Sequence, residues 1–206
     1  MYNLFFKRVI DVIITLAALP FFAICYVVVA IAIKLDDGGP VFYCGERLGK
    51  GLKKYKMYKF RSMVVHAPDI RNEDGTTFNS NHDERLTRVG RVIRKLSIDE
   101  VPQILNVLKG DMSFIGPRPS PCGNTHLYDK EYLRKFDVRP GITGYTQAYY
   151  RNGAPLEVKQ QSDLYYVDHI AFLLDVKIIL KTITTVFKRE GIYTNAGQDT
   201  GKEVNF

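Results

Sequence analysis

The chain has 206 residues, of which 46% are hydrophobic, enough for one domain with a sizeable core. Its 29 Lys and Arg residues outnumber 22 Asp and Glu residues, and the resulting net charge of +7 favours nucleic acid, an anionic lipid surface or a phosphorylated substrate as partner. The three cysteines form no CxxC pair and the four histidines have no zinc-ligand spacing, which argues against a disulfide framework and a zinc site.

The first predicted element is an apolar segment, residues 9–35, interrupted only by Asp11, Thr15 and Lys34. It is too long for the apolar region of a signal peptide, and it is long enough to span a membrane. However, Pro20 lies within it, where proline kinks or breaks a helix. Basic residues also flank both ends, which places both ends on the cytoplasmic side. We therefore predict a re-entrant helix that returns near Pro20, with a single spanning helix as the alternative.

Two later segments, residues 85–96 and 170–189, have helical periodicity with a basic face opposite an apolar face. Such amphipathic helices pack on a domain or lie on a membrane surface. We expect no nucleic-acid partner, because no nucleic-acid-binding motif accompanies the charge, which favours anionic lipid or phosphate instead. The expected apolar faces consist of Leu86, Val89, Ile93 and Leu96 in the first helix, and of Phe172, Val176, Ile179, Ile183 and Phe187 in the second.

Two adjacent carboxylates, Asp99 and Glu100, stand at the start of a predicted helix that ends near Gly110. Ser97 and Glu100 match a capping box, so a purely structural role is one interpretation. The other is chemical, because a helix N-terminus favours an ionised carboxylate that can act as a nucleophile or a metal ligand. Mg²⁺ binds to one or two carboxylates together with substrate phosphates, and this site has that composition.

A short proline-rich stretch follows this helix. Pro117 and Pro119 hold Arg118 in a stiff, extended backbone. A guanidinium that is fixed in this way can bind two phosphate oxygens at once. Taken alone, neither the carboxylates nor this arginine identifies a function.

The order and spacing of these elements resemble the bacterial sugar transferases, specifically the small monotopic phosphoglycosyl transferases. The central block, RLTRVGRVIRKLSIDEVPQILNVLKGDMSFIGPRP at 85–119, is the most specific match. The other matching motifs are KRVID at 7–11, YKFRSM at 58–63, VRPGITGYTQAYYRN at 138–152, DLYYVDH at 163–169 and LLDVKIILKT at 173–182.

This resemblance implies an enzyme that transfers a phosphosugar from a UDP-sugar to polyprenol (undecaprenyl) phosphate and releases UMP. In the family, the Asp of the Asp-Glu pair attacks the sugar-proximal phosphate and forms a covalent phosphosugar intermediate. That role falls to Asp99, with Glu100 beside it as base or electrostatic helper, and Mg²⁺ is expected to contact Asp99. Lys59, Arg118 and Arg151 match basic positions expected near the phosphates or the nucleotide, and Arg61 and Asp163 are also expected to bind substrate.

The resemblance also implies a fold and a location. We expect a mostly helical α/β protein with a re-entrant membrane helix at residues 1–36, a catalytic domain at 37–193 with amphipathic interfacial helices, and a loose tail at 194–206. It would lie on the cytoplasmic face of the bacterial inner membrane against anionic lipid, and it could form a homodimer. The chain departs from the family in two places. Leu19 precedes Pro20 where the family has Ser-Pro one turn later, and Tyr145 replaces the usual Trp.

Two rival interpretations account for some of these features. A non-enzymatic membrane tether would use the basic face to bind anionic lipid or an acidic partner, but it gives the acidic pair and the Pro-Arg-Pro stretch no role. A polytopic enzyme acting on the same substrates needs many hydrophobic spans, and this chain has one candidate.

Overall fold

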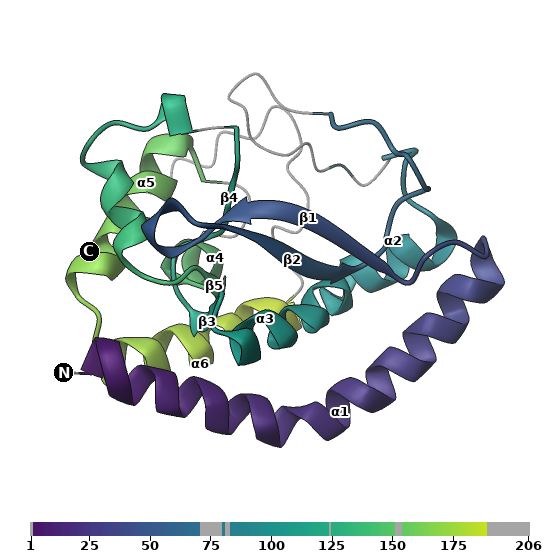
Figure 1. Ribbon diagram of the computed structural model, residues 1–206, viewed down its shortest axis with the longest axis horizontal. Helices are drawn as coiled ribbons and strands as arrows, with labels where there is room; N and C mark the ends of the chain where they lie inside the picture. Colours follow the sequence, from purple (N-terminus) through teal and green to yellow (C-terminus); the bar gives the residue numbers. More distant parts are fainter. Residues whose placement is uncertain (1, 71–79, 81–82, 124, 151–153, 189–206) are drawn as a thin grey trace.

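The computed structural model describes residues 2–70, 80, 83–123, 125–150 and 154–188. A long N-terminal helix, α1 (Lys7–Asp36), runs along one side of a small mixed α/β domain (Figure 1). The other helices are α2 (Arg88–Lys95), α3 (Ile104–Lys109), α4 (Tyr145–Tyr149), α5 (Leu156–Asp168) and α6 (Phe172–Lys188), with one π-helical segment (Tyr2–Phe6) and 3-10 turns at Lys50–Leu52, Ile98–Gln103, Thr125–Leu127 and Tyr132–Asp137. This architecture confirms the predicted mostly helical α/β class.

Two small sheets form the centre of the domain. In the first, β1 (Phe42–Leu48) pairs antiparallel with β2 (Lys54–Phe60) and, on its other edge, with β4 (Ser120–Pro121). In the second, β3 (Ser113–Ile115) lies parallel to β5 (Gly141–Thr143). The second sheet therefore joins two stretches, the one before Pro-Arg-Pro and the one that contains Pro-Gly-Ile-Thr-Gly, that lie far apart in the sequence.

The N-terminal helix is continuous, and both of its ends contact the domain. At the start, Lys7 forms an ion pair with Asp175 of α6, and at the end the Asp36 carboxylate accepts a hydrogen bond from the Val89 backbone NH of α2. The chain stays helical through Pro20, and Figure 1 shows a bend near the middle of α1. The predicted break is therefore a bend, because the loss of one backbone hydrogen bond at proline kinks a helix without ending it.

One side of α1 is apolar and exposed, whereas the opposite side carries buried polar groups. Lys7, Asp11 and Thr15 are buried, and the Asp11 carboxylate accepts hydrogen bonds from the Ser113 hydroxyl and the Phe114 backbone NH, both at 3.1 Å. The helix is long and apolar enough to cross a membrane, and its exposed side is suited to lipid. The exposed apolar side chains include Ile13, Leu16, Phe21, Ile24, Val28, Ile31 and Leu35.

The two predicted amphipathic helices are present. The apolar face predicted for the first is confirmed at Leu86 and Ile93, which are buried, although Leu96 is exposed, whereas the buried face of the second differs from the prediction. Helix α2 begins only at Arg88, because the Thr87 side chain caps it by accepting a hydrogen bond from the Gly90 NH. In α6, the buried positions are Asp175 and Ile178, whereas Phe172 and Ile183 of the predicted apolar face are exposed. The predicted face of α6 is wrong because Asp175 turns inward to form the ion pair with Lys7.

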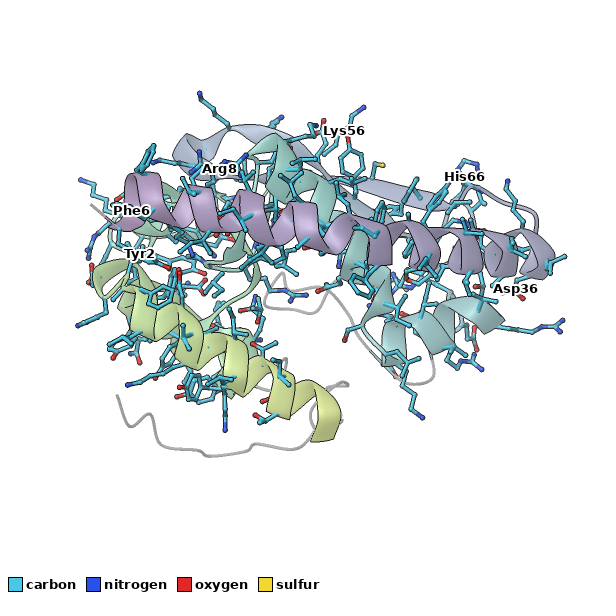
Figure 2. The ribbon with its side chains drawn as sticks, turned by 90° about the horizontal axis from the view of Figure 1, so that it is seen from below. Tyr2, Phe6, Arg8, Asp36, Lys56 and His66 are labelled. Carbon is cyan, nitrogen blue, oxygen red and sulfur yellow. The ribbon has the colours of Figure 1, made fainter. Side chains whose placement is uncertain are left out.

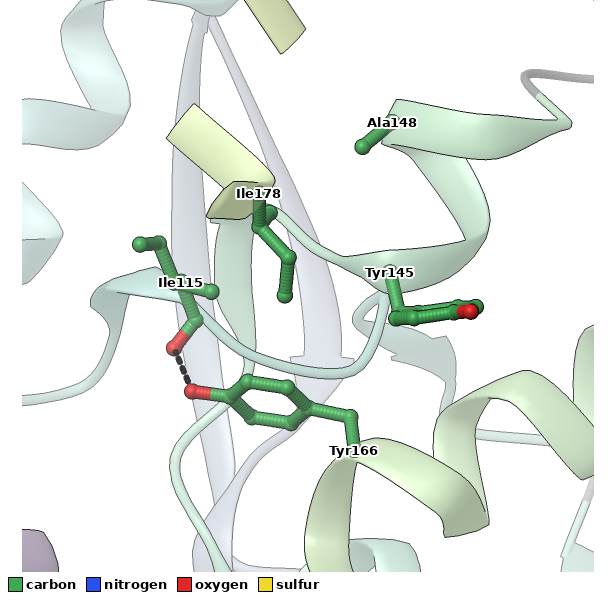
Figure 3. Packing of buried hydrophobic residues seen from close by; sticks show 5 residues of the cluster. All are labelled: Ile115, Tyr145, Ala148, Tyr166 and Ile178. Carbon is green, nitrogen blue, oxygen red and sulfur yellow. Dashed lines mark hydrogen bonds between the residues drawn. The ribbon is translucent and has the colours of Figure 1, made fainter. Parts of the chain in front are cut away.

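Among the described residues, the core of the domain consists of three small apolar clusters. The first packs Ile115 of β3 against Tyr145, Ala148, Tyr166 and Ile178 of α4, α5 and α6 (Figure 3). The Tyr166 hydroxyl lies within hydrogen-bonding distance of both the Ile115 carbonyl oxygen (3.2 Å) and the Asp175 carboxylate (2.8 Å), so this cluster is linked to the buried ion pair of α1. The second cluster joins α1 to β2 and α2 through Val29, Ile33, Phe60 and Ile93, and the third consists of Met57, Val107 and Met112.

Candidate active site

The acidic pair lies in the 3-10 helix Ile98–Gln103, between α2 and α3. Ser97 has left-handed backbone angles (φ 57°, ψ 19°), and this conformation reverses the chain between α2 and the acidic pair. The Ser97 side chain makes no capping hydrogen bond. The predicted capping box is therefore not formed, and Glu100 is available for a different contact. Pro102 lies inside the helix, where its missing NH is tolerated near a helix start.

Glu100 contacts a lysine that comes from the end of β2. The Lys59 ammonium lies 2.6 Å from Glu100 Oε1, and both side chains are about three-quarters buried. Asp99 is more deeply buried, with 8% of its surface exposed. Within the described part of the chain, no side chain donates a hydrogen bond to the Asp99 carboxylate. The two neighbouring carboxylates thus differ: among the described residues, Glu100 forms an ion pair with Lys59, and Asp99 forms none.

The two carboxyl groups have opposite pKa shifts. Burial raises the pKa of Asp99 to about 6, the Glu100 charge adds to this, and Lys59 and Arg94 oppose it. Burial also acts to raise the pKa of Glu100, but the positive charges of Lys59, Arg118 and Arg94 outweigh it and bring that pKa to about 2. At neutral pH both groups are ionised, and the charge on Asp99 is the less stabilised of the two.

Arg118 belongs to the same site, as its electrostatic effect on Glu100 shows. Its side chain is exposed, although Pro117 beside it is fully buried. The loop that carries it is locked against the Gly141–Gly144 segment by close backbone contacts. A Cβ atom at Gly144 would lie 2.1 Å from the Gly116 carbonyl oxygen, and one at Gly141 would lie 2.1 Å from the Gly116 nitrogen. These glycines let two loops pack closely enough to hold Arg118 near the acidic pair.

Arg94 is a member of this cluster that the sequence pattern did not indicate. Its charge lowers the pKa of both Asp99 and Glu100. Helical periodicity gave no reason to select it among the basic residues of α2. The left-handed Ser97, which brings the C-terminal end of α2 back beside the acidic pair, was not visible in the sequence pattern.

The structure does not bring the other predicted site residues to the acidic pair. Arg61 follows β2, and its side chain is buried beside the C-terminal end of α1. Its guanidinium donates hydrogen bonds to both carboxylate oxygens of Asp37 and to the Pro40 and Met63 carbonyls. Asp163 is buried elsewhere and accepts hydrogen bonds from Lys135, Tyr132 and Thr146. Both residues thus have structural partners within the domain, and their part in substrate binding stays a prediction. Arg151 and the predicted tail at 194–206 lie outside the described residues.

The donor set at the acidic pair fits a Mg²⁺ ion that takes most of its ligands from substrate and water. In the ranges that the structure describes, no group of three or more His, Cys, Asp or Glu side chains could enclose a metal. An enclosed metal site formed by the described side chains alone is therefore not built here. Asp99 supplies one oxygen-bearing group without a side-chain partner among the described residues, and Mg²⁺ commonly binds to one or two carboxylates plus phosphates.

Comparison with known proteins places this geometry in context. The sequence profile of the family described as "Bacterial sugar transferase" matches residues 2–189. The chain is 42% identical over 188 residues to "UDP-N-acetylgalactosamine-undecaprenyl-phosphate N-acetylgalactosaminephosphotransferase" of Aeromonas hydrophila, covering 88% of this chain and 44% of that protein.

Two further relatives show how the matched length varies. "Uncharacterized sugar transferase EpsL" of Bacillus subtilis is 46% identical over 161 residues, which are 78% of this chain and 76% of that protein. "Undecaprenyl-phosphate galactose phosphotransferase" of Salmonella typhimurium is 38% identical over 168 residues, 76% of this chain and 35% of that protein. The chain thus spans less than half the length of the Aeromonas and Salmonella relatives that it matches.

Proposed function

Because the chain belongs to the bacterial sugar transferase family, we propose that it transfers a phosphosugar from a UDP-sugar to undecaprenyl phosphate and releases UMP. The observation that carries this proposal is the asymmetry of the acidic pair, in which Glu100 is neutralised by Lys59 and buried Asp99 is not. The activities for which the Aeromonas and Salmonella relatives are named indicate the substrate class.

In the proposed first step, an oxygen of the Asp99 carboxylate attacks the phosphorus of the sugar-proximal phosphate. A P–O bond forms to Asp99, and the bond from that phosphorus to the oxygen bridging the two phosphates breaks. UMP leaves with the bridging oxygen and its electron pair. In the second step, a phosphate oxygen of undecaprenyl phosphate attacks the same phosphorus and displaces Asp99, which regenerates the carboxylate. The lipid product is undecaprenyl-diphosphate-sugar.

The residues around Asp99 perform two tasks in this scheme. Burial without an ion-pair partner keeps Asp99 reactive, because a carboxylate that is weakly solvated and not neutralised is the better nucleophile. Lys59, Arg94 and Arg118 place positive charge around the point where phosphate charge develops. We expect Mg²⁺ to be held by Asp99 together with the diphosphate, where it would neutralise phosphate charge.

The proposed substrate requires access to a membrane. The exposed apolar side of α1 and the exposed apolar residues of α6 would lie in lipid at the cytoplasmic face of the inner membrane. Both ends of α1 contact one domain, which supports a helix that enters and leaves on the same side. The tether alternative leaves the buried, oppositely shifted carboxyl groups without a role.

The proposal is tested by trapping the covalent intermediate. Protein is incubated with a panel of UDP-sugars and Mg²⁺ without acceptor, and the intact protein mass is measured. We expect a mass increase of one phosphosugar, located at Asp99 by peptide analysis, and UMP release. Asp99→Asn keeps the shape but removes the attacking charge, so it should form no adduct and lose activity on the order of a thousandfold or more.

Glu100→Gln is the matched control, because it changes the neighbouring carboxylate in the same way and leaves the nucleophile. It should be strongly impaired in turnover, yet still accumulate adduct. An adduct on Asp99→Asn, or one located at a different residue, would contradict the assignment. Absence of UMP release with every UDP-sugar would favour the tether.

A further inference from the structure

A second cluster of positive charge lies at the N-terminal end of α1, apart from the acidic pair. It surrounds a small pocket of about 20 Å³ between α1, the turn after β1, β3 and the segment before β5. The charged residues that line it are Lys7, Arg8, Asp11, Lys50 and Arg139. None of these residues belongs to the site formed by Asp99, Glu100, Lys59 and Arg118.

The cations of this pocket are only partly neutralised. Lys7 forms its ion pair with Asp175. Arg8 donates hydrogen bonds to the Val107 and Leu108 carbonyls at the end of α3, and Arg139 Nε donates one to the Gly110 carbonyl. Carbonyl groups satisfy these donors but carry no net charge.

Lys50 completes the pocket from the turn that follows β1, and its side chain is exposed. Across the described ranges, no carboxylate forms an ion pair with Arg8, Lys50 or Arg139. The Asp11 carboxylate in the lining is occupied by Ser113 and the Phe114 backbone NH. Three cations therefore face a single carboxylate, and this surplus favours an anion at the mouth of the pocket.

The surroundings of the pocket indicate which anion this is. Phe5 and Phe6 are 68% and 55% exposed, and Figure 2 shows Phe6 and Arg8 at the same end of α1. At the start of α6, Phe172 and Leu173 are also exposed, and Phe172 contacts the Tyr2 ring edge to face with centroids 6.0 Å apart. Apolar side chains beside a group of cations form the pattern that fits lipid tails next to a charged headgroup.

We propose that this pocket binds the phosphate of an anionic phospholipid headgroup, with Arg8, Lys50 and Arg139 around the phosphate and the neighbouring aromatic residues in the acyl region. The pocket has room for about one water molecule, so the phosphate binds at its mouth rather than inside it. A soluble phosphate or nucleotide would use the cations but not the exposed apolar residues. The proposal relies on the membrane association proposed above.

The test compares two lysines of the same β-hairpin in the full chain. Lys50→Gln removes a pocket cation, and Lys56→Gln removes a cation of β2 that is also exposed but does not line the pocket. Binding is measured to phosphatidylcholine vesicles with and without phosphatidylglycerol. We expect phosphatidylglycerol to strengthen binding of the parent and of Lys56→Gln. The gain in affinity should be about fivefold smaller for Lys50→Gln. Lys50→Arg should restore it.

Three results would overturn the lipid site. Equal losses in Lys50→Gln and Lys56→Gln would show that binding depends on the overall positive charge. Unchanged binding of Lys50→Gln would show that the pocket does not bind the headgroup. If inorganic phosphate abolished the gain while chloride at equal ionic strength did not, the ligand would be a small anion. The Lys50 side chain is exposed and makes no hydrogen bond within the described residues, so its removal should leave the melting temperature unchanged. Binding to vesicles of phosphatidylcholine alone tests membrane association, and UMP release tests the proposed activity. A loss confined to the phosphatidylglycerol effect therefore concerns the lipid site and neither of these.

Discussion

The Lys59 ammonium lies 2.6 Å from Glu100 Oε1 and makes no such contact with Asp99, although the two carboxylates are adjacent in sequence. A single lysine at the end of β2 thus forms an ion pair with one of two adjacent carboxylates and not with the other. Burial raises the pKa of Asp99 to about 6, because the charges of Lys59 and Arg94 offset only part of the cost of burying the ionised carboxylate.

The first prediction concerns pH. If ionised Asp99 is the nucleophile, kcat/KM should fall about tenfold per pH unit below pH 6, rather than below pH 4 as for an ordinary aspartate. Lys59→Met removes a charge that lowers the pKa of both carboxyl groups, so the acidic limb should move to higher pH. UMP release measured from about pH 4 to 8 gives the acidic limb of the parent and of Lys59→Met. Lys56→Gln is the control, and an unchanged limb in Lys59→Met would contradict the assignment.

The second prediction concerns the geometry of Arg118. The flanking prolines fix its backbone, and only a guanidinium offers two parallel donors to phosphate oxygens. Arg118→Lys keeps the charge but loses this fork, so activity should fall by about tenfold or more while the melting temperature stays the same, since the side chain is exposed. Near-normal turnover would show that a point charge is sufficient.

The third prediction concerns the contact between the two loops. A Cβ at Gly144 would lie 2.1 Å from the Gly116 carbonyl oxygen, a distance that the backbone must relieve by moving. Gly144→Ala should therefore lower the free energy of unfolding by about 2 kcal/mol or more and reduce activity by displacing Arg118. Gly123→Ala is the matched control, because a Cβ added there would meet no atom within 4 Å beyond its chain neighbours. Thermal denaturation compares the stability of the two variants, and UMP release compares their activity.

The fourth prediction concerns the path of α1. Both of its ends contact the same domain, so residues near both ends should be accessible from the cytoplasmic side. Single cysteines placed at Asn3 and Gly38, in a background that lacks Cys25, Cys44 and Cys122, are labelled with a membrane-impermeant reagent in oriented vesicles. Both should react from the cytoplasmic side only. Labelling of position 3 from the outside alone would establish a spanning helix.

The sequence by itself determined the features that depend on local chemistry and motif order. The apolar segment with Pro20, the basic helix within residues 85–96 and the helix ending near Gly110 follow from periodicity and residue type, and the motif order identified the family. These properties involve residues that are neighbours along the chain, so no knowledge of the fold is needed to infer them.

Only the tertiary structure decided which distant charges meet. The sequence did not indicate that Asp163 pairs with Lys135, that Arg61 pairs with Asp37, or that Arg94 lies near the acidic pair. An ion pair depends on distance and burial in three dimensions, whereas sequence shows only the sign of each charge. For the same reason Asp175 could not be placed on the buried face of α6 until Lys7 was found beside it.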